Sequence, residues 1–144
     1  MPAPRHKKRS RLRLAAAVLL GLFLLYAGVS HLLLARAEFV AQVPSWIPLP
    51  ADFVVVASGI VEIVLGASLI VLPRQRVLVG WVVAAFFVAV FPGNISQYTT
   101  QVDAFGLNSD TARFIRLFFQ PLLVIWALWS TGAWHQLRLS PQVK

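Results

Sequence analysis

One acidic residue, Glu62, interrupts a stretch of apolar and small residues, VVVASGIVEIVLGASLIVL, from Val54 to Leu72. A helix of about 20 such residues is long enough to cross the hydrocarbon of a bilayer. A carboxylate near the bilayer centre costs roughly a few kcal/mol unless it is neutralised, paired or hydrated. Such a residue is expected to face the interior of a bundle, where it binds a ligand or a proton or joins a polar network. Glu62 is therefore the strongest indication of function in this chain.

Other polar residues in apolar surroundings gather toward the same end of their helices. Glu62 itself lies roughly 13 Å from the outer end of its span, at 1.5 Å per residue. Ser58 precedes it by one turn on the same face, and Arg116 and Gln120 share a face at i and i+4. We expect an ion pair between Glu62 and Arg116, with Gln120 as a bridge. The predicted ligand-binding or polar-network residues are His31, Ser58, Glu62, Asn94, Arg116 and Gln120.

Two prolines lie close to these polar residues. Pro121 leaves the carbonyl of Leu117 without its usual helical donor, and Pro92 with Gly93 permits a helix break beside Asn94. Broken helices at membrane depth are tolerated where they face protein or a wet cavity. Together these residues favour a polar pocket in the outer half of the bundle.

Each of these residues also has a purely structural interpretation. Glu62 would fix the register of the bundle if it were protonated and hydrogen-bonded to Ser58 or to a neighbouring helix. Arg116 would extend its side chain to the lipid headgroups. His31 would rest at the interface as an amphipathic ring, and the prolines would only kink their helices for packing. The sequence leaves these alternatives open.

The elements that position these residues are predicted to be transmembrane helices. The chain of 144 residues is 58% hydrophobic and 12% charged, a balance outside that of soluble domains. Helices are favoured over a barrel because no run of alternating polarity appears. We therefore predict an all-α fold, an integral membrane four-helix bundle with spans at about 14–34, 53–72, 77–98 and 114–131.

The distribution of charge predicts the orientation of these spans. Arg36, Arg113 and Arg116 fall on one side of the membrane, together with every acidic residue except Glu62. The remaining Lys and Arg residues fall on the other side, namely Arg5, Lys7, Lys8, Arg9, Arg11, Arg13, Arg74, Arg76, Arg138 and Lys144. The positive-inside rule then places both termini in the cytoplasm, which predicts a multi-pass protein of the plasma membrane.

This topology divides the chain into three parts. Residues 1–13 form a basic cytoplasmic segment, residues 14–131 the four-span domain, and residues 132–144 a cytoplasmic tail. A basic run directly before a span is explained by topology and by contact with anionic lipid headgroups, so no nucleic-acid partner is expected. The first outer loop, residues 36–52, is expected to begin with a short interfacial helix. That helix would form a lid over the pocket or lie at the level of the headgroups.

The residue types present limit the chemistry. The chain contains no Cys, which excludes thiol catalysis and metal or iron–sulfur sites held by Cys. It carries no nucleophile paired with a base, no cluster of metal ligands and no glycine-rich phosphate loop. No catalytic residue, metal site or covalently bound cofactor is therefore predicted.

Several short patterns, taken in order, are similar to those of a known family. They are Gly28-x-x-His31, a loop with Val-Pro and Leu-Pro, Ser58-Gly59-x-x-Glu62-x-x-x-Gly66, Phe91-Pro92-x-Asn94 and Arg116-x-x-x-Gln120. The chain therefore resembles the DoxX-like family of small four-helix membrane proteins, except in its basic N-terminus and its last residues. The resemblance implies membership in a group named after a subunit of a quinone-linked membrane oxidoreductase. Other members are tied to oxidative-stress complexes or act as assembly factors.

Three functions are compatible with these observations. The first is a membrane subunit or anchor of a quinone-linked oxidoreductase or oxidative-stress complex, whose pocket binds a quinone or another lipid-like ligand. The second is a structural or assembly-chaperone protein without a ligand, and the third is a small proton-coupled transporter. Catalysis by the chain alone is not expected. The expected partners are membrane lipids and a membrane or peripheral oxidoreductase subunit, and a homo-oligomer stays open.

Overall fold

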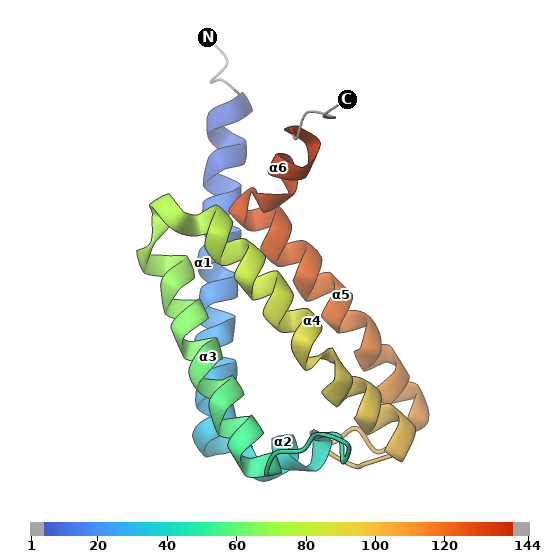
Figure 1. The fold of residues 1–144 in the computed structure, drawn as a ribbon. Helices are drawn as coiled ribbons and strands as arrows, with labels where there is room; N and C mark the ends of the chain where they lie inside the picture. The colour runs from blue at the N-terminus through green and yellow to red at the C-terminus, as the bar shows by residue number, and fades with distance from the viewer. Residues whose placement is uncertain (1–4, 140–144) are drawn as a thin grey trace, which may run out of the picture.

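The computed structural model describes residues 5–139, and its regular structure in that range is helical (Figure 1). The elements are α1 (Arg5–Val29), a π-helical turn (Ser30–Leu34), α2 (Arg36–Gln42), α3 (Ala51–Val71), a 3-10 turn (Pro73–Gln75), α4 (Arg76–Thr100), α5 (Asp110–Thr131) and α6 (Ala133–Leu139). The outermost parts of the predicted basic segment and tail, 1–4 and 140–144 with Lys144, lie outside the described residues.

Four helical segments of the described chain are long and apolar enough to cross a membrane. They are Lys8–Leu34, Ala51–Val71, Pro73–Thr100 and Asp110–Thr131. The predicted all-α fold is confirmed for the described residues, and the four long apolar helices indicate a multi-pass membrane protein. Each helical segment begins earlier than predicted because polar and charged residues continue the helix beyond the apolar run.

The helices of the spans depart from regular α-helical geometry at Ser30–Leu34, and not at the prolines that the sequence indicated. The predicted break at Pro92 is wrong, since α4 continues through this residue, as α5 does through Pro121. A proline removes a single helical hydrogen bond, and the bonds on either side keep both helices continuous. The first span instead changes to a π-helical turn, in which the Ala35 N–H donates to the Ser30 carbonyl over 2.9 Å. Such turns are frequent at functional sites, and this one contains His31.

The four long helices form two pairs, α1 with α3 and α4 with α5 (Figure 1). The pairs approach each other where α1 begins and α6 lies, which we call the converging end. They separate toward the opposite end of the bundle, which we call the diverging end. There, α2 and the loop formed by residues 101–109 lie between the pairs. The arrangement resembles two helical hairpins that are joined at one end.

The converging end is a close-packed apolar core. Its Trp126 indole N–H donates to the Ala16 carbonyl over 2.9 Å, which ties α5 to α1. Gly80 of α4 lies so close to α5 that an added Cβ would be 2.6 Å from the Cβ of Thr131. The buried apolar members of this core are Leu20, Leu24, Leu65, Leu69, Val79, Val83, Ala84, Phe87, Ala127, Leu128 and Ala133.

Four glycines bring α1 and α3 into backbone contact. A Cβ added to Gly21 would lie 2.7 Å from the carbonyl oxygen of Gly66, and one added to Gly66 would lie 2.6 Å from that of Gly21. Gly28 and Gly59 make the same reciprocal contact nearer the diverging end, at 2.6 Å and 3.1 Å. Small residues permit such close approach between membrane helices. The α1–α3 pair therefore stays closed where the two pairs separate.

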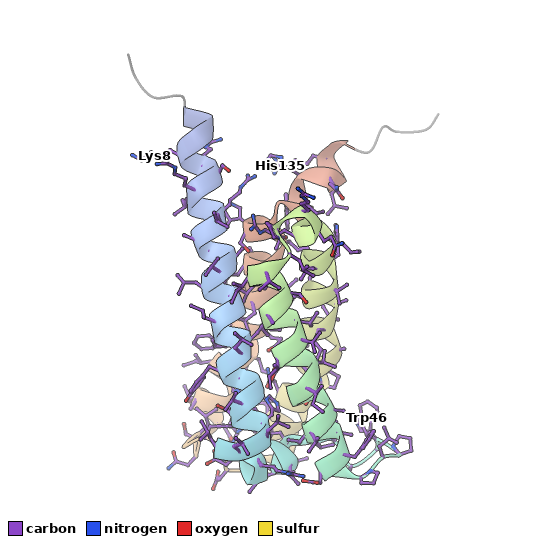
Figure 2. All side chains as sticks on the ribbon, turned by 90° about the vertical axis from the view of Figure 1, so that its left-hand side faces the viewer. Lys8, Trp46 and His135 are labelled. Atoms are coloured by element: carbon purple, nitrogen blue, oxygen red, sulfur yellow. The ribbon has the colours of Figure 1, made fainter. Side chains whose placement is uncertain are left out.

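The outer surface of the bundle is apolar. Each long helix exposes large hydrophobic side chains by more than half of their area, for example Leu22, Val64, Leu78 and Phe118. Figure 2 shows side chains extending outward along the whole bundle, with Lys8 and His135 at the converging end and Trp46 at the opposite end. An apolar surface of this extent is expected where helices contact lipid.

Candidate functional site

A pocket of about 920 Å³ lies between the two helix pairs, toward the diverging end. Its walls come from α1, α3, α4 and α5, and α2 with the outer loops borders it at the diverging end. All the candidate residues singled out from the sequence line it: His31 in the π turn, Ser58 and Glu62 in α3, Asn94 in α4, and Arg116 and Gln120 in α5. The fold thus brings these residues together, while their role in binding stays a prediction.

Glu62 is buried in the middle of α3, and its neighbour is His31. The His31 Nδ1 lies 2.8 Å from Glu62 Oε2 and 2.9 Å from the carbonyl oxygen of Ala27. Because a carbonyl oxygen only accepts, Nδ1 carries a proton in this arrangement. That proton points to Ala27, so the contact with Glu62 is close but is not a well-aligned hydrogen bond, and Oε2 has no other partner. Glu62 Oε2 is therefore a buried acceptor without an aligned donor in the described protein.

The predicted ion pair between Glu62 and Arg116 is wrong. Arg116 Nη1 instead donates to Gln97 Oε1 over 2.8 Å, and Nη2 lies 3.5 Å from Gln42 Oε1. The guanidinium carbon also lies 4.8 Å from the ring centre of Phe105. Gln42 and Gln97 are buried and joined by a hydrogen bond of 3.0 Å. Arg116 therefore turns toward the diverging end, because amide oxygens and an aromatic face receive it there.

Gln120 does not bridge the predicted pair but joins α5 to α4. Its Nε2 donates to the Phe87 carbonyl over 2.7 Å, and its Oε1 accepts from Asn94 Nδ2 over 3.0 Å. The Ser58 hydroxyl likewise donates within its own helix, to the Val55 carbonyl over 2.9 Å. Polar side chains in apolar surroundings take the nearest backbone acceptor when no water is present. These amides and the hydroxyl stabilise the pocket walls and leave the charged side chains to meet a ligand.

A line of aromatic contacts connects the two charged groups of the pocket. The His31 ring stacks on Phe39 of α2 with centres 3.5 Å apart, and Phe39 meets the edge of Phe105 at 4.7 Å. Phe105 in turn lies under the Arg116 guanidinium. Its backbone is left-handed, with φ of 56°, and its N–H donates to the Glu38 carboxylate of α2. The loop 101–109 is thereby anchored to α2 at the diverging end.

Arg113, one turn before Arg116, has a different environment. It is buried, and its guanidinium forms ion pairs with Asp103 and with Asp110, the latter at 2.8 Å. Its Nε also donates to the Val102 carbonyl over 3.3 Å. No described carboxylate forms an ion pair with Arg116. Arg116 therefore places a positive charge in the pocket, and no carboxylate of the described residues pairs with it.

Four residues of this network were not selected from the sequence, namely Phe39, Gln42, Gln97 and Phe105. A signal for Gln97 exists, since it follows Asn94 at i+3 on the face that meets α5. Gln42 ends a short amphipathic segment, which gives it no distinctive spacing. Phe105 reaches the site only because its left-handed backbone turns the loop inward. That conformation is uncommon for a bulky residue and has no sequence pattern.

The inner part of the pocket is apolar. Phe23 and Ala27 of α1 face Leu123 and Trp126 of α5 there, on the side of the polar groups that is nearer the converging end. From Arg116 to Trp126 the pocket follows α5 for roughly 15 Å, at 1.5 Å per residue. A site that is polar at one end and apolar along its length suits an amphipathic molecule.

The donor set of the pocket suits an organic head group. Among the residues that the structure describes, no group of three or more His, Asp or Glu side chains could hold a metal ion. Arg116 offers N–H donors, whereas Glu62 and the Nε2 of His31 offer acceptors. A head group with both an acceptor and a donor could contact both walls.

Comparison with known proteins gives a family but no function. A family model described as Domain of unknown function (DUF8561) matches residues 20–131, and the chain therefore belongs to this family. No match was found among curated proteins or among solved structures. Function must accordingly be argued from the pocket.

Proposed function

We propose that this member of the DUF8561 family binds a lipid-like ligand with a polar head, of the quinone class, in the pocket between its helix pairs. The observation that carries the proposal is the lining of that pocket, where charged groups gather at one end and aromatic and aliphatic side chains line the rest. A quinone requires a hydrogen-bond donor for its carbonyl oxygen and an apolar slot for its ring and tail. The pocket provides both.

In this proposal the head group lies between Arg116 and Glu62. The N–H groups of Arg116 that the buried amides do not use donate to a carbonyl oxygen of the quinone. On the other wall, the Glu62 carboxylate and the Nε2 of His31 accept from a hydroxyl of the reduced form. The hydrophobic tail then extends toward Trp126 and the converging end.

We further propose that the protein lies in the plasma membrane with both termini in the cytoplasm. The acidic groups Asp52, Asp103 and Asp110 lie in helix starts and loops of the diverging end. Lys8, which Figure 2 shows at the opposite end, lies there with Arg13, Arg74 and Arg76. This asymmetry of charge supports a cytoplasmic converging end. The polar part of the pocket then faces the outer leaflet, and α2 covers it at the interface.

A partner enzyme completes the proposal. The resemblance to the DoxX-like family implies a membrane subunit or anchor of a quinone-linked oxidoreductase or an oxidative-stress complex. The apolar outer faces of the spans offer surface to such a subunit or to a second copy of the chain. In this role the partner supplies the electrons, and the present chain holds the ligand.

Two other functions differ from this proposal in what they require of Glu62. A structural or assembly-chaperone protein requires Glu62 only for stability. A small proton-coupled transporter requires the carboxylate to take up and release a proton. The contact between Glu62 and His31 favours the transporter over the structural protein, because an imidazole beside a carboxylate can pass a proton.

Native mass spectrometry of the protein in mild detergent tests the proposal. We expect a quinone-sized adduct on the wild type, reduced at least about tenfold in Arg116→Gln, since a hydrogen bond to a charged group contributes about 1.5–3 kcal/mol. Glu62→Gln is expected to weaken the adduct as well. Asp52→Asn is the matched control, because it removes an exposed carboxylate of the same helix outside the pocket.

The alternatives predict different results. If no protein carries an adduct and Glu62→Gln only lowers the melting temperature, the structural function is correct. If no adduct appears but vesicles with the wild type show a proton flux that Glu62→Gln abolishes, the transporter is correct. An adduct that is equal in all the variants would place the ligand outside the pocket and contradict the proposal.

A further inference from the structure

A second, smaller pocket of about 260 Å³ lies at the converging end of the bundle. It forms where the beginning of α1 passes the end of α5 and α6. Its lining shares no residue with the larger pocket and consists of Arg13, Ile125, Trp129, Trp134, His135 and Arg138. The proposed function makes no use of these residues.

This pocket carries positive charge that no described carboxylate neutralises. Arg13 Nη2 donates to His135 Nε2 over 2.8 Å, which requires a lone pair on Nε2 and therefore an uncharged imidazole with its proton on Nδ1. The ion pairs among the described residues lie elsewhere, and none includes Arg13 or Arg138. The acidic residues of the chain lie in the middle of α3 or at the diverging end. The two guanidinium groups therefore favour an anionic ligand.

The position of the pocket along the helices corresponds to the border between headgroups and acyl chains. Arg13 directly precedes the apolar run of the first span. Trp129 and Trp134 are 41% and 43% exposed, and tryptophan prefers this interface. Gly132 between them has φ of 82°, a left-handed conformation that ends α5 and redirects the chain into α6. That turn brings Arg138 to the pocket that Arg13 also lines.

One wall of the pocket is apolar and continues into the membrane. Ile125 and Trp129 lie one turn apart on α5, and Ile125 is 51% exposed. A soluble anion at the guanidinium groups would leave this wall uncovered. An amphiphile covers it, because its chain lies along the wall while its charge stays with the arginines.

We propose that this pocket binds the phosphate of an anionic phospholipid, with an acyl chain against Ile125 and Trp129. The planar guanidinium groups of Arg13 and Arg138 hold the phosphate oxygens in a forked geometry. The bound lipid offsets part of the positive charge of the pocket and joins α1 to α6 beside the hydrogen bond from Arg13 to His135. This site depends on no residue of the larger pocket, so the two proposals can fail separately.

Titration of the delipidated full chain in uncharged detergent tests this site, with native mass spectrometry as the readout. The probes are phosphatidylglycerol and phosphatidylcholine with identical chains, and excess inorganic phosphate as a competitor. We expect the wild type to retain phosphatidylglycerol in preference to phosphatidylcholine. The double variant Arg13→Gln with Arg138→Gln should lose at least about tenfold of that affinity, since each basic residue near an anionic surface contributes to binding.

The matched control is the double variant Lys8→Gln with Arg74→Gln. It removes the same charge from exposed residues near the same end but outside the pocket. A loss of less than about threefold is expected for it, because screened charges at the surface contribute little to a specific site. An equal loss in both double variants would contradict the site and indicate general attraction to negative lipid.

Three further outcomes decide the proposal. Equal retention of phosphatidylcholine would contradict the requirement for a net anionic lipid. Complete displacement by inorganic phosphate would identify an anion site that needs no acyl chain. If the glutamine variant does not fold, Arg13→Lys with Arg138→Lys takes its place. A fall of about threefold or more in its affinity then supports the forked contacts, and an unchanged affinity contradicts them.

Discussion

The two ends of the bundle are built differently, although the same helices run through both. At the converging end, leucine and valine side chains from both helix pairs fill the space between them. At the diverging end the pairs separate around a pocket of about 920 Å³ with charged groups on its walls. Close packing gains dispersion contacts that a pocket forfeits. Stability is therefore concentrated at the converging end, and the capacity to bind a ligand at the diverging end.

The difference concerns only the space between the pairs and not the pairs themselves. Gly21 with Gly66 and Gly28 with Gly59 hold α1 against α3 at both levels. A bundle made from two closed hairpins can open a pocket at one end without breaking any helix. In agreement with this, α4 and α5 remain continuous through Pro92 and Pro121.

Removing a core side chain at the converging end should have the largest effect on stability. Leu69 is fully buried there, and Leu69→Ala is expected to cost about 2–5 kcal/mol because it leaves a cavity. The control is Ile115→Ala, which truncates a half-exposed side chain of the pocket and should change stability by about 0.5 kcal/mol or less. Thermal unfolding in detergent measures both. Equal losses would refute the contrast between the two ends.

A methyl group in the glycine contact should have the next largest effect. A Cβ at Gly66 would meet the backbone oxygen of Gly21, which cannot move aside, so Gly66→Ala is expected to cost about 1–3 kcal/mol. Gly93→Ala is the control, since the nearest atom to its Cβ would be 3.7 Å away. Alanine in place of a helical glycine should there be neutral or slightly stabilising. A stable Gly66→Ala protein would show that α1 and α3 are not in backbone contact.

Releasing the loop at the diverging end should have a smaller and local effect. Glu38→Ala removes the acceptor for the Phe105 N–H, so amide exchange in residues 101–109 should become about fivefold faster, as expected for one hydrogen bond. Amides of the converging end should be unchanged. Glu38→Gln keeps an acceptor oxygen and should leave the loop nearly as protected. Faster exchange throughout the chain would mean that Glu38 supports the whole bundle.

The ion pair between Arg36 and Asp52 should have the smallest effect. Its hydrogen bond from Arg36 Nε measures 2.6 Å, but the two side chains are 44% and 59% exposed. Solvent and salt screen such an exposed pair, so Arg36→Gln should shift the melting temperature only slightly, and less in high salt. A loss as large as that of Leu69→Ala would show that the diverging end contributes to stability as much as the core does.

The positions of the helices and the identity of the polar residues that line the pocket follow from the sequence, because both depend on local properties. Four apolar runs suffice to indicate the spans, and the depth of each polar residue follows from helical rise. Polar residues at a similar depth in one bundle face a shared interior, because exposing them to lipid is costly. His31, Glu62 and Arg116 therefore meet in one pocket, as their spacing indicates.

The partners within the pocket could not be derived in the same way. They depend on how each helix is rotated about its axis and on which neighbours it meets. Glu62 lies beside His31 because α1 and α3 form the glycine-packed pair, whereas Arg116 belongs to the other pair. Arg116 also meets Phe105 through a loop conformation, with Phe105 in the left-handed region, that the sequence does not encode in any pattern.

The π-helical turn at Ser30–Leu34 also sets the direction in which the next helix, α2, leaves the first span. Such a turn contains one residue more than an α-helical turn, and one residue corresponds to about 100° of rotation. Deleting a single residue there would restore an even helix and swing α2 around the axis of the first span, away from the loop that its Glu38 holds. The additional residue thus separates two functions of the same span. The glycine face of α1 stays aligned with α3, and the direction of α2 across the opening of the pocket is set independently by the turn.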